Sequence, residues 1–117
     1  MQRVEVDNSQ FLKGVLDLAV LAVLGEKDSY GYDVVRRLRE RGLDSVGDAS
    51  VYGTLRRLYQ AGALNSYVVP SDEGPHRKYY GLNDRGRKTL DQSAKAWASL
   101  SGALNQLLNG RSHENGH

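Results

Sequence analysis

The sequence contains no cysteine, and this absence excludes disulfides and thiolate-based zinc or redox sites. A chain without cysteine fits a reducing cytosol. The most apolar run, VLDLAVLAVL at residues 15–24, is too short to cross a bilayer and contains Asp17. The first ten residues are not strongly basic and no A-x-A cleavage site follows them, so we expect no signal peptide. We therefore expect a cytoplasmic protein without a membrane partner.

The signatures of common enzyme classes are also missing. The chain has no G-x-S-x-G motif, no glycine-rich phosphate loop and no cysteine nucleophile. HENGH at residues 113–117 matches the H-E-x-x-H zinc motif, but that motif needs a helix, a third ligand and a substrate cleft. Because Asn-Gly breaks helices and the sequence ends there, we expect no catalytic residue, no metal site and no enzymatic activity.

A strong net charge is absent, but the charge that is present is unevenly distributed. The 117 residues suit one domain with a modest core, and the net charge is only +2. Residues 48–88 hold seven Lys or Arg against four Asp or Glu, and the rest of the chain holds nine against ten. The positive excess in the central segment indicates an anionic partner. Arg outnumbers Lys eleven to five, which suits phosphate and base contacts or reflects genome composition.

Breakers and hydrophobic periods predict three helices in the first half of the chain. The first starts near Ser9, ends at Gly25 and is buried on nearly all sides. The second, YGYDVVRRLRER, has Ser29 as a candidate N-cap and stops at Gly42. The third runs from about Ser50 to Gly62.

A hairpin and a long helix are predicted to follow. LNSYVVP and HRKYYGL are β-prone and are joined by SDEG and Pro75, and Asn83 is a candidate N-cap for the last helix. The predicted fold class is mainly α with a small β-hairpin, in the order of a winged helix-turn-helix. The predicted parts are a flexible arm (1–8), a winged helix-turn-helix domain (9–82), a dimerisation helix (83–110) and a disordered tail (111–117).

The third predicted helix has one narrow apolar side and one broad polar side. A spacing of 100° per residue places Val51, Leu55, Leu58 and Gly62 on the apolar side. Arg can pair with guanine and Gln with adenine, and glycine permits close approach, so the polar side fits a DNA major groove. The alternative is a merely solvated face. The polar side consists of Gly53, Arg56 and Gln60, flanked by Tyr52 and Arg57.

The predicted hairpin carries basic side chains directly after its turn. His76, Arg77 and Lys78 could reach phosphates or the minor groove as the wing of a DNA-binding domain. Asp72 and Glu73 in the turn would repel phosphate, so contact is expected from residues 76–78. The alternative is a charged hairpin that protects its edge from aggregation.

Four stretches together resemble the PadR family of transcriptional regulators, in its short type with a single C-terminal helix. They are LDLAVLAVLGEKDSYGYDVVRRL, SVYGTLRRLYQAGAL, HRKYYGLNDRGRKTL and the long helix that follows. The resemblance implies a homodimeric repressor that binds a palindromic operator in double-stranded DNA. It also implies that the third helix enters the major groove, that the wing flanks it, and that the first and last helices form the dimer.

Matching positions imply DNA contacts from Tyr52, Arg56 and Arg57, and from Arg77 and Lys78 of the wing. Gly53 stands where many members have proline, and Gly81 where a larger polar residue is common, which limits the transfer of individual base contacts. In many members Tyr30 and Tyr32 help to position the second helix, but we expect them simply to pack under it. The alternative function is a winged-helix module that binds another protein. The full set of predicted DNA contacts is Ser50, Tyr52, Gly53, Arg56, Arg57, Gln60, His76, Arg77 and Lys78.

The last predicted helix supports a dimer independently of the resemblance. Its Leu, Ala, Trp and Ser residues from Leu90 to Leu108 recur at spacings of 4, 3, 4, 3 and 4, which is an a/d seam. The alternative is packing onto the same subunit, but about 25 residues span nearly 40 Å, which is too long for full self-packing. The predicted dimerisation residues are Leu90, Trp97, Leu100, Leu104 and Leu108.

Trp97, the only tryptophan, is surrounded by Ala, Ser and Gly. These small neighbours either let two helices approach closely, with the ring filling the interface, or leave space for a flat ligand. Most buried tryptophans are simply packed, which favours the first interpretation. The resemblance supports the second, because some PadR-like dimers bind planar drug-like molecules between their C-terminal helices. We expect no cofactor, but a planar aromatic effector is a hypothesis. Its predicted contacts are Phe11, Val15, Leu18, Ala94, Trp97 and Ser101.

Overall fold

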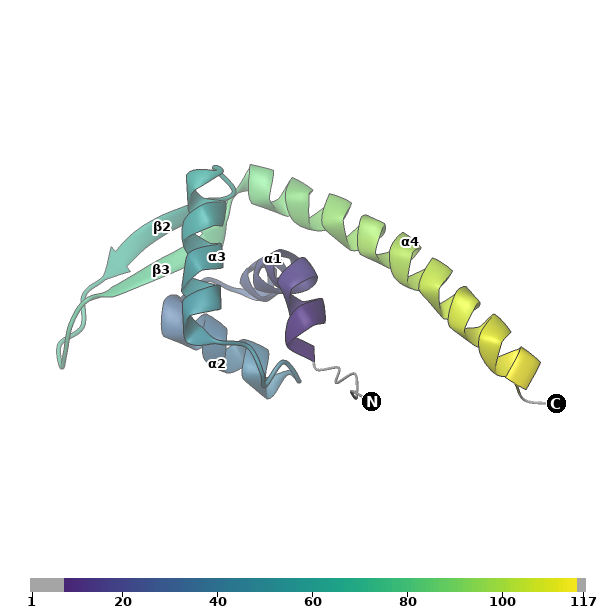
Figure 1. Cartoon of the computed structure of the whole chain (residues 1–117). Coiled ribbons are helices and arrows are strands. Elements are labelled where there is room, and N and C mark those ends of the chain that lie inside the picture. The colour runs from purple at the N-terminus through teal and green to yellow at the C-terminus, as the bar shows by residue number, and fades with distance from the viewer. Residues whose placement is uncertain (1–7, 116–117) are drawn as a thin grey trace.

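The computed structural model describes residues 8–115, with side chains described for residues 11–110. Four helices and a three-stranded antiparallel sheet make up this part of the chain (Figure 1). The predicted fold class, mainly α with a winged helix-turn-helix order, is therefore confirmed. The elements are α1 (Asn8–Glu26), β1 (Ser29–Tyr30), α2 (Gly31–Glu40), α3 (Asp48–Gln60), β2 (Leu64–Val69), β3 (Arg77–Leu82) and α4 (Asp84–Asn115).

The helices α1, α2 and α3 enclose the core, whereas the β2–β3 wing and α4 project away from it in different directions (Figure 1). The molecule therefore extends over 64 Å in its longest direction and only 21 Å in its shortest. The helix α1 contacts α2, α3, β3 and the beginning of α4, but it is not buried on nearly all sides as predicted, because Phe11, Gly14 and Ala22 leave one side exposed. Among its residues with described side chains, the buried ones are Leu12, Leu16, Val20, Leu21, Val23 and Leu24.

The prediction that Ser29 caps α2 is wrong. Ser29 is fully buried in the two-residue strand β1, which pairs with β3 through Ser29 and Tyr80 and through Tyr30 and Tyr79. The Ser29 hydroxyl accepts a 2.7 Å hydrogen bond from Arg37, whose guanidinium also donates to Glu26 at 2.8 Å. The Ser29 hydroxyl therefore binds Arg37 of α2 and does not cap the helix.

Several helix ends differ from the prediction by a few residues. The helix α3 begins at Asp48, and the N-cap residue Gly47 makes no side-chain cap. The predicted stops at Gly42 and Gly62 are correct, because both glycines follow a helix with positive φ, 109° and 83°. Asn8, the last residue of the predicted flexible arm, begins α1, and the rest of that arm lies outside the described residues.

The predicted end of α4 at Gly110 is also wrong. This helix continues through Gly110 to Asn115, so residues 111–115 are helical and not a disordered tail. A glycine inside a helix costs only about 1 kcal/mol relative to alanine, and Gly110 is therefore not an obligatory stop. The side chains of the HENGH segment lie outside the described residues.

The root of α4 is fixed to the end of α3 by Asn83. The Asn83 side chain accepts a 2.9 Å hydrogen bond from the Gly86 amide, which confirms it as an N-cap, and its Nδ2 donates to the Gly62 carbonyl at 2.8 Å. The backbone of Gly86 lies directly against Ala63, where a β-carbon would collide with the Ala63 carbonyl oxygen. One turn later, Leu90 packs against the core beside Gly25 of α1.

No helix within residues 8–115 is long and apolar enough to cross a membrane.

Gly86→Ala should destabilise the fold, because the new methyl group collides with backbone atoms that cannot rotate away. We expect a loss of about 1–3 kcal/mol in the free energy of unfolding, measured by urea denaturation. Gly102→Ala is the matched control on the same helix, because no atom lies within 4 Å of its β-carbon position. The control should gain up to about 1 kcal/mol from helix propensity. Equal effects of the two substitutions would contradict close packing at the root of α4.

Candidate nucleic-acid interface

The inner side of α3 packs in the core, and its outer side is left uncovered. Val51, Leu55 and Leu58 are buried as predicted, and Thr54, which the periodicity did not assign to the core, is buried between them. Gly62, predicted on the same stripe, lies beyond the helix end. Arg56 and Gln60 are exposed, and no atom lies within 4 Å of the β-carbon position of Gly53. The fold therefore leaves room for a side chain at residue 53 and does not itself demand the glycine.

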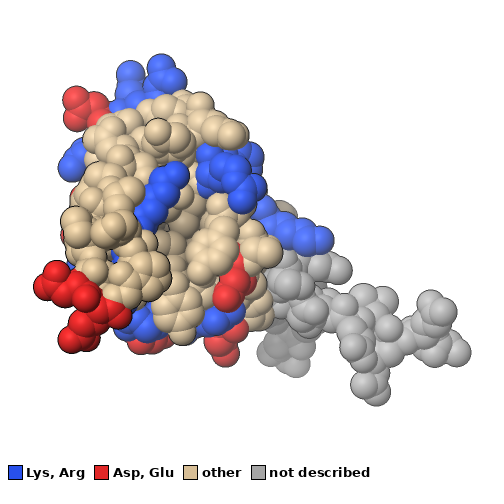
Figure 2. Space-filling model, turned by 90° about the vertical axis from the view of Figure 1, so that its left-hand side faces the viewer, with Lys and Arg blue, Asp and Glu red and all other residues tan. Residues whose placement is uncertain are grey.

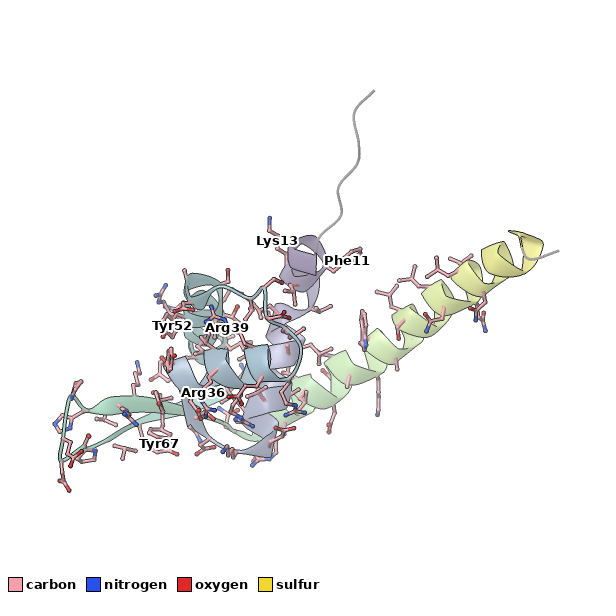
Figure 3. All side chains as sticks on the ribbon, turned by 90° about the horizontal axis from the view of Figure 1, so that it is seen from below. Phe11, Lys13, Arg36, Arg39, Tyr52 and Tyr67 are labelled. Carbon is pink, nitrogen blue, oxygen red and sulfur yellow. The ribbon has the colours of Figure 1, made fainter. Side chains whose placement is uncertain are left out.

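A hollow of about 420 Å³ opens on one side of α3, between this helix, the start of α2 and the strand β3. We call it the wing hollow. The ring of Tyr52 (labelled in Figure 3) packs directly against Gly31 and lines this hollow. A β-carbon at Gly31 would lie 2.8 Å from the ring. Gly31 thus fixes the direction of a predicted contact residue. The hollow is lined by Tyr30, Gly31, Tyr32, Tyr52, Leu55, Arg56, Tyr59, His76, Arg77, Lys78 and Tyr80.

Aromatic rings hold the wing cations in this hollow. The Lys78 ammonium lies 5.4 Å from the centre of the Tyr59 ring and 5.6 Å from that of Tyr80, and the Arg77 guanidinium lies 4.6 Å from the ring of Tyr30. These are cation–π distances, which orient a charged group while leaving its hydrogen-bond donors available. The structure therefore brings together Arg56 of α3, His76 of the turn before β3, and Arg77 and Lys78 of β3.

Of the tyrosines that line this hollow, the sequence predicted only Tyr52 as part of the interface. Tyr59 was not singled out, although it follows Tyr52 by seven residues, which places both rings on one side of a helix. Tyr32 was expected to pack under α2, but 54% of its surface is exposed and it lines the hollow. Tyr30 is half-buried and also lines the hollow instead of lying beneath the helix.

A second hollow of about 310 Å³ lies on the opposite side of α3, against α1. We call it the α1–α3 hollow. The Arg57 guanidinium donates to both carboxylate oxygens of Asp17, at 2.8 and 3.1 Å, and to the Thr54 hydroxyl at 3.3 Å. Hydrogen bonding to Asp17 raises the pKa of Arg57 above its ordinary value. The hollow is lined by Lys13, Leu16, Asp17, Ala49, Ser50, Gly53, Thr54 and Arg57.

On the face that carries the wing, Lys and Arg are separated from most Asp and Glu. Figure 2 shows Lys and Arg at the top and along the right-hand side of this face, with most Asp and Glu along its lower edge. Asp48, in the first turn of α3, is paired with Arg39 of α2 at 2.7 Å. This pair neutralises the acidic residue that lies closest in sequence to the predicted contact residues of α3.

The predicted dimerisation and effector residues have different environments. Leu90 packs against the core of its own subunit, as the alternative to the seam has it, and not on the uncovered part of α4. Trp97 is 45% exposed, Phe11 of α1 is 66% exposed, and Leu107, which the a/d pattern missed, is 71% exposed. Val15 and Leu18 are half-buried on α1, as is Ser101 on α4, whereas Ala94 is exposed. The other exposed large apolar residues of α4 are Leu100, Leu104 and Leu108.

Known proteins are similar to this chain in sequence, and two of them are solved structures with a similar fold. A transcriptional regulator from Streptococcus is 35% identical, with 84% of this chain and 96% of that chain covered and a TM-score of 0.75. A PadR-like transcriptional regulator from Bacillus cereus is 32% identical, with 85% and 96% covered and a TM-score of 0.76. A protein of Lysinibacillus sphaericus named Uncharacterized protein X is 28% identical over 104 residues, which are 87% of this chain and 95% of that protein.

The family assignment follows from the match over the winged-helix region. Residues 20–92, from the middle of α1 to the first turns of α4, match the Transcriptional regulator PadR-like family. This range contains α3, the wing and the junction that directs α4 away from the core. The chain therefore belongs to the PadR-like family of transcriptional regulators.

Proposed function

We propose that the protein is a cytoplasmic repressor that binds a palindromic DNA operator as a homodimer and is released by a small planar effector. The observation that carries the DNA-binding part is the uncovered side of α3, with Gly53 at its centre and a hollow containing cations on each side. An α-helix is about 10–12 Å wide and a major groove about 12 Å, so α3 fits the groove along its exposed side.

The exposed apolar side of α4 supports the homodimer. Trp97, Leu100, Leu104, Leu107 and Leu108 are all well exposed on a helix that leaves the core (Figure 1). On a helical wheel at 100° per residue these residues span about 100°, which is the width of an apolar stripe that packs against other elements and suits contact with a partner subunit. The exposed Phe11 on α1 is a further apolar group for the same interface.

The effector hypothesis rests on the same region. Trp97 has small neighbours on α4, and Phe11, Val15 and Leu18 lie along one side of α1. In a dimer, a ligand between these groups would change the distance between the two copies of α3. Operator half-sites lie about 34 Å apart, so a change in that distance weakens DNA binding.

Arg56→Ala tests the groove-facing side of α3. If Arg56 pairs with a base, the variant should lose about 1–3 kcal/mol of binding free energy on the operator and discriminate less at one position. Gel-shift titration with the DNA upstream of the gene, and with random DNA, measures both quantities. Lys95→Ala is the control, because it removes an exposed cation from α4. Wild-type protein that binds no DNA would favour the alternative, a protein-binding module.

Arg77→Ala combined with Lys78→Ala tests the wing. Each lost phosphate contact reduces the slope of log affinity against log salt by about 0.9, so the double variant should lose up to about 2 in slope. Affinity measured by fluorescence anisotropy at several salt concentrations gives this value. An unchanged slope in a fully folded variant would show that the wing does not touch DNA.

Trp97→Ala tests the effector hypothesis. Planar aromatic compounds should quench Trp97 fluorescence and lower operator affinity together, because they stack on the ring in the dimer. The variant should remain a dimer by analytical ultracentrifugation and bind the operator, but lose the response to these compounds. Dissociation of the variant into monomers would instead assign Trp97 to interface filling.

A further inference from the structure

The helix α3 has functional groups on both of its flanks, and only one flank faces the wing. Tyr52 and Tyr59 lie on the flank of the wing hollow, whereas Ser50 and Arg57 lie on the flank of the α1–α3 hollow. A helix in the major groove has one phosphate backbone on each side, because the two strands form the two walls of the groove. The wing can contact the phosphates of one strand, so groups near α1 are available to contact those of the other strand.

The α1–α3 hollow contains the donors that a phosphate needs. Lys13 of α1 contributes an ammonium, Ser50 a hydroxyl and Arg57 a guanidinium, and all three line the same space beside Gly53. Asp17 is the one carboxylate among its described lining residues, so the side chains of the hollow carry one net positive charge. Both oxygens of that carboxylate already accept hydrogen bonds from Arg57.

The contacts of Arg57 fix its guanidinium without using all of its donors. Asp17 holds it from α1, and the buried Thr54 holds it from the preceding turn of α3. A guanidinium has five N–H donors, so a bidentate pair with one carboxylate leaves others for a ligand. An arginine fixed in this way loses less side-chain entropy when it binds than a free one does.

We propose that the α1–α3 hollow binds a backbone phosphate of the DNA strand opposite to the one contacted by the wing. Lys13 and Arg57 contact the phosphate, and Asp17 is a positioning residue that directs Arg57 toward it. The inference rests on the proposed DNA-binding function and extends the interface to α1. In Figure 3, Lys13 and Tyr52 mark the two sides of this extended interface.

The first experiment measures the salt dependence of binding to DNA that the wild-type protein selects from a random-sequence library. Lys13→Ala should lower the slope by up to about 0.9, the value for one phosphate contact, and should weaken binding on all DNA sequences alike. Lys13→Arg should retain the slope, because the charge is preserved. Lys95→Ala on α4 is the matched control and should behave as wild type. A Lys13→Ala variant that matches this control would overturn the contact.

The second experiment is a double-mutant cycle between α1 and α3. Asp17→Asn should weaken DNA binding in the wild-type background, although it removes a negative charge, because Arg57 loses its fixed direction. In the Arg57→Ala background the same substitution should no longer weaken binding. A merely structural role for Asp17 would weaken binding equally in both backgrounds. Tighter binding by Asp17→Asn alone would show that Asp17 masks Arg57, and would overturn the positioning role.

The wing variants separate failure of this inference from failure of the proposed function. If the wild-type protein selects DNA and the Arg77→Ala, Lys78→Ala variant loses slope, DNA binding stands. Wild-type behaviour of both Lys13→Ala and Asp17→Asn would then refute the α1 contact alone. If the wild-type protein selects no DNA, the proposed function and this inference both fail. Thermal unfolding of every variant excludes a loss of fold as the cause.

Discussion

The burial of α1 is the constraint on which the rest of the structure depends. This helix has apolar residues around most of its circumference, and it packs against α2, α3, β3 and the root of α4. It supplies six of the sixteen buried apolar side chains of the described core, and burial of apolar surface is the main favourable term in the folding of a small domain. It also contacts both α3 and α4, so the helix that we propose to face DNA and the helix that leaves the core are joined through one packed element.

A local polar network complements this support at the start of the sheet. Arg37 is only 8% exposed and connects the buried Ser29 with Glu26 at the end of α1. Arg41 also donates to Glu26, and its hydrogen bond is the main cause of the lowered pKa of that carboxyl. Arg37 of α2 and Arg41 directly after it therefore hold the end of α1, where the chain turns toward β1. Tyr30 of β1 and Gly31 at the start of α2 follow that turn, and they contact Arg77 and Tyr52 in the wing hollow.

Elements whose apolar residues repeat at a regular spacing could be predicted from the sequence. Elements and contacts that depend on residues far away in the sequence could not. Val51, Leu55 and Leu58 mark the buried side of α3 because a helix repeats every 3.6 residues. The two-residue strand β1 has no period, and its residues are identified only through Tyr79 and Tyr80, about fifty positions later. Likewise, 40 positions separate Asp17 from Arg57, and nothing near either residue in the sequence indicates their contact.

The tyrosines of the wing hollow illustrate the same limit. Tyr52 and Tyr59 share a helix flank by spacing, but Tyr30 and Tyr80 join them only when β1 pairs with β3. Their aromatic character alone fitted a core as well as a surface. The two-sided form of the candidate interface therefore emerges from packing, whereas its charged members, such as Arg56 and Lys78, could be identified from the sequence.

The junction at Asn83 has a consequence for the chain lengths that this fold tolerates. Asn83 binds the end of α3 through its amide side chain, and α4 begins at the next residue without a flexible linker. A single inserted residue just after this junction would rotate the remainder of α4 by about 100° and turn its apolar side away from the partner subunit of the proposed dimer. The turn between β2 and β3 has no helix after it whose rotation an inserted residue would change. In the proposed dimer, insertions and deletions could thus accumulate at the tip of the wing, whereas the spacing from Asn83 to Trp97 would have to stay constant.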